Sequence, residues 1–192
     1  ADVSGAHYRW GDRRVNAGGV TTFSRQAVIS ENRLTKIPKG IPNRDAALVG
    51  CTVPTGLGSV FNTAGAKPGQ SIVIFGAGGV GLCAVAGAAI AGCMPIIAVD
   101  VREEKLALAQ RMGSTHQINA AELDPVAEKN RITSGGADIA VEASGRPTAM
   151  AQALESVRNH GVAVIVGNAH HGERIDLDPH QFNLGKQMRG TW

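Results

Sequence analysis

The chain has 192 residues, 43% of them hydrophobic and 18% charged, which is enough for one folded domain and part of a second. Its net charge is only +3, the basic residues are dispersed, and aromatics make up 4%, so we expect no nucleic-acid surface. The three cysteines form no C-x-x-C pair and the first residues do not resemble a signal peptide, so we expect a cytoplasmic protein.

Residues 71–99 carry no charge and would be long enough to cross a bilayer. Six glycines and Pro95 interrupt this stretch, however, and its middle is alanine rather than leucine, so no membrane span is expected. We interpret it as a buried strand, a glycine turn, a helix of small residues and a second buried strand.

The first part of the chain, up to about residue 44, has an irregular pattern. Apolar and β-branched residues predict short strands at 20–23 and 26–29. Small and apolar residues then allow a helix over 44–64, interrupted near Pro54 and Gly56.

From residue 71 onward, short apolar runs alternate with helical patterns. Strands are predicted at 71–75, 95–101, 116–119, 137–143, 162–167 and 187–192. Helices are predicted at 79–92, 103–112, 124–133 and 147–158. This alternation is typical of an α/β protein with a doubly wound, parallel, six-stranded Rossmann sheet.

The central motif is Gly76-Ala77-Gly78-Gly79-Val80-Gly81, a G-x-G-x-x-G that follows a predicted strand and opens a predicted helix. In such a motif the first glycine permits a tight turn, the second lets a pyrophosphate approach the backbone, and the third lets the helix pack closely. The helix N-terminus offers unpaired N–H groups to the phosphates.

Asp100 lies 24 residues after Gly76, at the end of the second strand. A carboxylate there accepts hydrogen bonds from ribose hydroxyls and repels a 2′-phosphate, which favours NAD over NADP. A methyltransferase-type fold also places glycines after its first strand and an acid after its second. A glycine turn with an unrelated surface aspartate is the other alternative.

Several segments together resemble the zinc-dependent, medium-chain alcohol dehydrogenase family. They are GCTVPTG (50–56), KPGQSIVIFGAGGVG (67–81), AVDVREEKLALAQRMGS (98–114), EASGRP (142–147), GVAVIVG (161–167) and the closing QMRGTW. Residues 19–24 and the Val28-Ile29 pair resemble the end of that family's GroES-like catalytic domain. The resemblance implies that residues 1–52 are a β-rich remnant of the catalytic domain and residues 53–192 the NAD-binding Rossmann domain.

The resemblance also implies roles for individual residues around NAD. The cofactor-binding positions that it implies are Thr55, Gly76, Gly78, Gly79, Val80, Gly81, Asp100, Lys105, Ser144, Arg146, Val166 and Asn168, with the backbone near Thr191. Thr55 and Val80 match residues that pack on the nicotinamide, and Val166 and Asn168 match residues near its carboxamide. Lys105 matches a basic residue near the ribose, while Ser144 and Arg146 match the adenine side.

Cys51 matches the third protein ligand of the family's catalytic zinc. From the residues alone, a lone cysteine before a helix is more often a buried core thiol. A catalytic zinc needs three protein ligands. The family's first cysteine, its Gly-His-Glu motif and its structural-zinc lobe would all come before Ala1, so we expect this chain to lack a complete zinc site.

The leading expectation is the NAD-binding portion of a zinc-type alcohol dehydrogenase, which in the complete enzyme passes a hydride between an alcohol or aldehyde and NAD(H). We expect this portion to bind NAD without turnover. The alternatives are a non-catalytic dinucleotide-binding module and a zinc-free quinone or enoyl reductase relative. Because family members often extend the sheet through its last strand, we expect a homodimer formed through residues 187–192.

Overall fold

The computed structural model describes residues 7–16, 25–27 and 29–191. The chain divides into two compact units, residues 1–42 and 43–192. The boundary between these units lies ten residues before the domain boundary expected at 52/53. Compactness alone does not assign residues 43–52 to either domain of the family, so that boundary stays a prediction.

The first unit contains a short antiparallel hairpin. Strands β1 (His7–Trp10) and β2 (Arg13–Asn16) pair with each other, and the turn between them includes Gly11 at φ +62°. A single 3-10 turn, η1, covers Glu31–Arg33. The strand predicted at 26–29 is wrong at the described positions 26, 27 and 29. An apolar run needs a neighbouring strand to pair with, and β1 and β2 pair with each other. The strand predicted at 20–23 lies outside the described residues.

The second unit begins with three consecutive helical segments, α1 (Asn43–Val49), α2 (Thr52–Gly58) and the π-helical turn η2 (Ser59–Ala64). The helix breaks between α1 and α2 rather than near Pro54 and Gly56. Pro54 lies in the first turn of α2, where its missing N–H has no helical partner to lose. A Cβ on Gly56 would lie 2.5 Å from the Val80 carbonyl oxygen, so this glycine permits close packing of α2 on the next helix.

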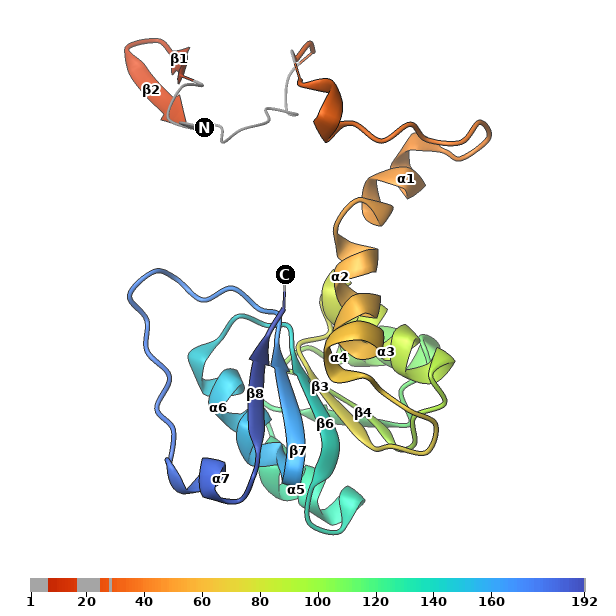
Figure 1. Cartoon of the computed structure of the whole chain (residues 1–192), viewed down its shortest axis with the longest axis vertical. Coiled ribbons are helices and arrows are strands. Elements are labelled where there is room, and N and C mark those ends of the chain that lie inside the picture. The colour runs from red at the N-terminus through yellow and green to blue at the C-terminus, as the bar shows by residue number, and fades with distance from the viewer. Residues whose placement is uncertain (1–6, 17–24, 28, 192) are drawn as a thin grey trace. The chain divides into compact units, whose positions relative to one another are not determined.

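A parallel six-stranded sheet follows, confirming the predicted fold class (Figure 1). Its strands are β3 (Ile72–Phe75), β4 (Ile96–Asp100), β5 (His116–Asn119), β6 (Ala137–Glu142), β7 (Val157–Ile165) and β8 (Gln187–Gly190). β7 begins five residues earlier than predicted, because its first part holds exposed polar residues that lack a strand's apolar pattern.

The remaining helices connect these strands. They are α3 (Gly79–Ile90), α4 (Glu103–Arg111), α5 (Pro125–Thr133), α6 (Pro147–Ser156) and the short α7 (His180–Asn183). The N-terminus of α5 is capped by Asp124, whose side chain accepts a hydrogen bond from the Val126 N–H at 3.0 Å. No helix among the described residues is long and apolar enough to cross a membrane.

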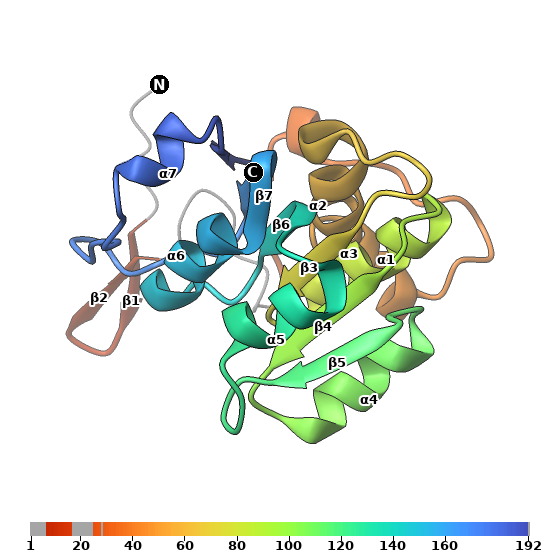
Figure 2. The ribbon, with the colours of Figure 1, turned by 90° about the horizontal axis from the view of Figure 1, so that it is seen from below.

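The helices cover both faces of the sheet (Figure 2). On one face, η2, α3 and α4 enclose a core with Ile72, Ile74 and Ile96. On the other face, α6 encloses a core that includes Val73 and Phe75. Residues of β3 therefore alternate between the two cores, which is why the strand is apolar throughout.

The strand order is β5-β4-β3-β6-β7-β8. The chain runs outward from β3 through β4 to β5, then returns to the other side of β3 and runs outward again from β6 to β8. The order therefore reverses between β3 and β6. In open α/β sheets, ligands bind beyond the carboxyl ends of the strands at such a reversal.

Candidate functional site

The glycine turn joins the end of β3 to the start of α3. Gly76 adopts φ +90°, and its N–H donates to the Val99 carbonyl at 2.7 Å. A Cβ on Gly76 would lie 2.9 Å from the Ser144 backbone nitrogen, and a Cβ on Gly81 would collide with the Gly76 carbonyl oxygen. Both positions must therefore be glycine for the turn, the helix and the neighbouring strand to pack.

Gly78 differs from these two glycines. A Cβ built on Gly78 would meet nothing within 4 Å, and the residue has an ordinary φ of −76°. Neither backbone strain nor protein packing requires a glycine there. The open space above Gly78 borders a pocket, so the missing side chain leaves room for a ligand to approach the backbone.

Asp100, the last residue of β4, is 9% exposed. Its Oδ2 accepts the Ala77 N–H at 2.8 Å, and its Oδ1 accepts the N–H groups of Val101 at 2.8 Å and Arg102 at 3.1 Å. A carboxylate has about four acceptor positions, and these bonds fill three of them. One acceptor position therefore remains for a ligand hydroxyl.

Two cations lie beside Asp100. The Lys105 Nζ is 3.8 Å from the Asp100 Oδ2, while the exposed Arg102 guanidinium pairs with Glu104. Lys105 and the three N–H dipoles direct positive charge at the carboxylate. A carboxylate at this position can accept a hydrogen bond from a hydroxyl and disfavours a phosphate beside it.

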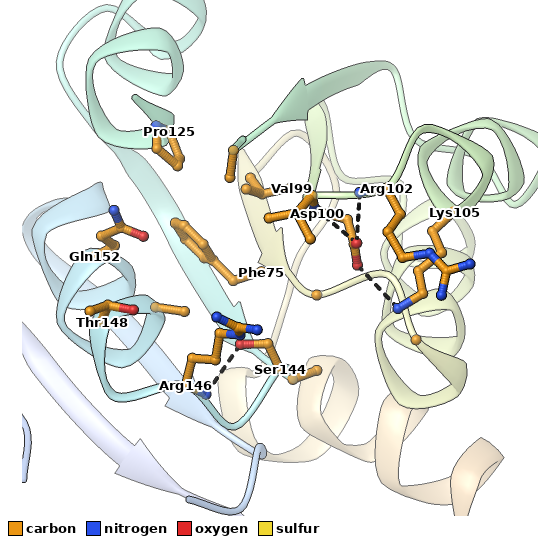
Figure 3. A pocket seen from close by; sticks show the side chains of 16 residues that line it. Phe75, Val99, Asp100, Arg102, Lys105, Pro125, Ser144, Arg146, Thr148 and Gln152 are labelled. Carbon is orange, nitrogen blue, oxygen red and sulfur yellow. Dashed lines mark hydrogen bonds and ion pairs between the residues drawn. The ribbon is translucent and has the colours of Figure 1, made fainter. Parts of the chain in front are cut away.

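A pocket of about 530 Å³ lies at the carboxyl edge of the sheet, between the ends of β4, β3 and β6. Figure 3 shows Asp100, Arg102 and Lys105 on one side of it, Thr148 and Gln152 on the other, and Phe75 between them. The pocket thus lies at the reversal of strand order.

The turn after β6 forms the second wall of this pocket. Ser144 and the exposed Arg146 both line the cavity, and the Arg146 N–H donates to the Ser144 Oγ at 3.3 Å. The buried Glu142 fixes the backbone of this turn, because its Oε1 accepts the Ser144 N–H at 2.7 Å and the Gly145 N–H at 2.9 Å.

The residues predicted for the nicotinamide side lie elsewhere than in the pocket. Val166 and Asn168 follow β7, where a Cβ on Gly145 would lie 2.7 Å from the Asn168 carbonyl oxygen. The Thr191 N–H donates to Ile165 at 3.1 Å, and its hydroxyl bonds that of Thr63 at 2.8 Å. The strand pairing of β7 with β8 brings these two segments together.

Cys51 lies at the N-terminus of α2, exposed, with its Sγ 4.0 Å from the Thr55 Oγ1. Among the described residues, no group of three or more His, Cys, Asp or Glu side chains could hold a metal ion. The described donors do not fit a complete zinc centre, since Cys51 has no second His, Cys, Asp or Glu ligand grouped with it among the described residues. Its part in a zinc site stays a prediction.

The predicted residues thus fall into two groups. Gly76, Gly78, Asp100, Lys105, Ser144 and Arg146 line the pocket. The other group lies outside the pocket lining, in α2, in the first turn of α3 and after β7, and comprises Thr55, Gly79, Val80, Gly81, Val166 and Asn168.

Sequence reasoning missed several residues of this region, among them Arg102, Phe75 and Glu142. Arg102 and Phe75 line the pocket, and Glu142 supports it. From the sequence, Phe75 is expected to be an ordinary core residue of a buried strand, and Arg102 is expected to be an exposed charge. A signal for Glu142 was available, because a carboxylate ending an apolar strand directly before a Ser-Gly pair is placed to accept their N–H groups.

Comparisons with known proteins agree with this geometry. Residues 79–192 match the model of the family described as zinc-binding dehydrogenase. The chain is 39% identical over 176 residues to S-(hydroxymethyl)glutathione dehydrogenase of Synechocystis sp., covering 90% of this chain and 48% of the relative. It is 37% identical over 176 residues to alcohol dehydrogenase class-3 of Zea mays, covering 90% of this chain and 46% of that protein.

Solved structures give the same result. A crystal structure of an alcohol dehydrogenase zinc-binding domain protein from Burkholderia ambifaria matches with a TM-score of 0.84 at 37% identity, covering 90% of this chain and 47% of that one. Benzyl alcohol dehydrogenase from Acinetobacter calcoaceticus matches with a TM-score of 0.84 at 35% identity, covering 90% and 48%. The chain spans about half the length of the relatives that it matches. It belongs to the zinc-binding dehydrogenase family of alcohol dehydrogenases, as its six-stranded sheet and glycine turn indicated.

Proposed function

We propose that residues 43–191 bind NAD(H) at the carboxyl edge of the sheet. The observation that carries this proposal is the open space at Gly78 beside the one remaining acceptor position of Asp100. A pyrophosphate fits over the first, and a ribose hydroxyl fits the second. The residues present therefore suit this cofactor.

Each part of the cofactor has a matching part of the site. The N–H groups of residues 79–81, in the first turn of α3, have no helical acceptor and suit the pyrophosphate. Asp100 and Lys105 suit the adenosine ribose, and Ser144 and Arg146 suit the adenine. We assign the nicotinamide end to Thr55, Val80, Val166, Asn168 and the backbone near Thr191.

A calorimetric titration of the 192-residue chain tests this assignment. We expect NAD and ADP-ribose to bind, and NADP to bind at least about tenfold more weakly because Asp100 repels its 2′-phosphate. Asp100→Ala should narrow the difference in affinity between NAD and NADP, since Lys105 then faces the phosphate without the Asp100 carboxylate beside it. Tighter NADP binding by the unaltered chain would contradict the role of Asp100, and no binding of any dinucleotide would contradict the proposal itself.

In the complete protein we propose the activity of a zinc-dependent alcohol dehydrogenase. There NAD supplies a hydride acceptor, and Cys51 serves as one zinc ligand together with ligands from the remainder of the protein. The substrates would be a small-molecule alcohol and its aldehyde. The chain of 192 residues should bind NAD and show no alcohol-dependent reduction of it, whereas a longer form carrying the missing ligands should turn over and lose that activity on Cys51→Ala.

We also propose that the chain forms a homodimer through β8. This strand pairs with β7 on one side, three of its four residues are exposed, and no other strand of the described residues pairs with its second edge, which could therefore pair with a second copy. Light scattering should give twice the chain mass. Met188→Pro, which removes an N–H from the strand, should shift the protein toward the monomer if the outward edge carries the contact.

A cytoplasmic location is consistent with the thiols. Cys51, Cys83 and Cys93 are all free, and burial raises the pKa of Cys83 and, together with the nearby Asp138 charge, that of Cys93. A raised pKa keeps these two thiols protonated and unreactive. Fractionation of cells that express the tagged complete protein tests the location directly.

A further inference from the structure

Glu142 is a buried carboxylate at the reversal of strand order. It is the last residue of β6, it lies opposite Phe75 of β3 and Ile165 of β7, and it is 0% exposed. Its Oε2 has no hydrogen-bond partner among the described residues. Burial of a half-satisfied carboxylate is costly, so its retention needs an explanation.

The other carboxylate oxygen is saturated. The Glu142 Oε1 accepts the Ser144 N–H at 2.7 Å, the Ser144 O–H at 2.5 Å and the Gly145 N–H at 2.9 Å. One oxygen therefore fixes both the backbone and the side chain of the turn that walls the pocket. Three hydrogen bonds to one oxygen therefore fix the conformation of this turn.

Glu142 also holds the turn that follows β7. Its carbonyl oxygen accepts the N–H groups of Val166 at 2.8 Å and Gly167 at 2.9 Å. A Cβ on Gly167 would lie 2.5 Å from the Glu142 Oε2 and would collide with the Gly145 nitrogen. The unpartnered oxygen thus lies against Gly167, and the turns after β6 and β7 touch each other beside it.

The fixed Ser144 in turn supports the glycine turn. A Cβ on Gly76 would lie 2.9 Å from both the Cβ and the backbone nitrogen of Ser144, so the two residues are in direct contact. Asp100 holds the same glycine turn from β4, through the Ala77 N–H. Two buried acids, one on each neighbour of β3, therefore bracket the turn that faces the pocket.

We infer that Glu142 is a positioning residue of the cofactor site. It sets Ser144 against Gly76 on the adenosine side and sets Gly167, next to Val166 and Asn168, on the nicotinamide side. One residue, through its carboxylate and its backbone carbonyl, thereby fixes the relative placement of the two turns that would hold the two ends of an extended dinucleotide. This inference rests on the proposed NAD binding for its ligand, but the positioning of the turns can be measured without any ligand.

The first test compares Glu142→Gln with Asp138→Asn in the 192-residue chain. Asp138 lies on the same strand at its opposite end and likewise accepts an N–H and an O–H from one serine, Ser71, at 2.8 Å each. It therefore matches Glu142 in its hydrogen bonds to a serine and lies outside the pocket lining. We expect Glu142→Gln to weaken NAD and ADP-ribose binding by about tenfold, and Asp138→Asn to leave both within about twofold.

The second test asks whether Glu142 acts through Ser144. If it does, Glu142→Gln in a Ser144→Ala background should weaken NAD binding by clearly less than tenfold, because residues in one hydrogen-bond network are not additive. A general loss of stability would instead give additive effects. Equal loss of affinity in the Glu142 and Asp138 variants, or unchanged affinity in Glu142→Gln, would overturn the inference.

Amide hydrogen exchange by NMR keeps the inference testable if NAD does not bind. Glu142→Gln should speed exchange at Ser144, Gly145 and Ala77, while Asp138→Asn should speed it at Ser71 only. Failure of the unaltered chain to bind NAD would remove the proposed function and leave this measurement to decide the role of Glu142. Unchanged exchange at Ser144 and Gly145 would remove the inference, whatever the chain binds.

Discussion

At both ends of β6 a carboxylate accepts hydrogen bonds from a serine, but only one of these two places borders a pocket. At the carboxyl edge, Glu142 accepts an N–H and an O–H from Ser144, and the turn so fixed walls an open pocket. At the amino edge, Asp138 accepts the same two groups from Ser71 and is then covered by the Arg158 guanidinium at 2.7 Å. A carboxylate–serine pair is thus a general way to fix strand ends, and what lies beyond the pair decides whether the place can bind a ligand.

The glycines near these strand ends are of two kinds, crowded ones and open ones. At the amino edge, a Cβ on Gly136 would lie 2.6 Å from the Arg158 backbone, and one on Gly161 would lie 2.9 Å from the Arg158 carbonyl oxygen. At the carboxyl edge, Gly78 opens onto empty space. A glycine of the first kind allows two backbone segments to pack closely, and a glycine of the second kind leaves space that a ligand can enter.

The largest effect is expected from Gly81→Ala. Its Cβ would collide with the Gly76 carbonyl oxygen, and backbone on both sides leaves little room to relax, so we expect a loss of more than about 3 kcal/mol in the free energy of unfolding. Gly78→Ala is the matched control, and it should lower that free energy by less than about 1 kcal/mol while abolishing NAD binding. Urea unfolding and calorimetry check both, and similar unfolding midpoints for the two variants would contradict the distinction between closed and open glycines.

A gain in the free energy of unfolding is expected when the buried Lys129 is replaced by an apolar residue. It is 0% exposed, and burial together with the Lys186 charge lowers the pKa of Lys129 to about 8. The unfolded chain, with a pKa near 10.5, then binds more protons between pH 8 and pH 10.5, so the unfolding free energy rises with pH across that window and the full penalty applies below it. Lys129→Met should therefore stabilise the chain at pH 7 by up to about 3 kcal/mol.

The advantage of Lys129→Met should shrink toward zero as the pH rises from 8 to 10.5. Thermal unfolding of both proteins across this range measures it, with the exposed Lys67→Met as a control that should show no such trend. A constant difference between the variant and the unaltered chain at all pH values would show that Lys129 is not charged inside the fold.

A smaller effect is expected from Asp138→Asn. Burial raises the pKa of Asp138, but hydrogen bonds from Ser71 and the Arg158 guanidinium outweigh it, so the pKa lies below its usual value. The stabilisation is therefore present above the unfolded pKa of about 3.9 and is lost as the pH falls through the lower folded value. We expect a loss of about 1–2 kcal/mol at pH 7, and acid unfolding curves for the two proteins that converge at low pH.

The smallest effect should come from Arg131→Ala. Its guanidinium pairs with Glu128 three residues away in α5, and its side chain is 76% exposed. The pair lowers the pKa of Glu128, yet water and salt screen an exposed ion pair, so we expect no measurable change in Tm. A clear fall in Tm would mean that α5 depends on its surface charges as well as on its buried face.

Much of the second unit could be predicted because its strands and helices have clear periods. The starts of β3, β4 and β6 and the glycine turn fall within a residue or so of expectation, since apolar runs between glycines leave few alternatives. The break between α1 and α2 was misplaced, because Pro54 and Gly56 signal a break only where a helix interior would suffer from them.

The candidate site was predicted only in part. Gly78 and Asp100 could be predicted from their residue types and spacing. The roles of Glu142 and Lys129 depend on burial that the sequence does not show. A lysine in an amphipathic helix normally faces water, and only the packing around α5 places Lys129 inside. Charged residues that break the pattern of exposure are therefore the ones that sequence reasoning misses.

The position of β3 at the reversal of strand order bears on how the sheet assembles. Only α3 separates β3 from β4 in the sequence. Two strands, β4 and β5, and three helices separate β3 from β6. Contacts distant in sequence form late, so we expect the β3–β4–β5 half to assemble first and the β6–β7–β8 half to dock onto it. A dinucleotide lying across β3 and β6 would then join the two halves, and it should slow their separation as well as occupy the site.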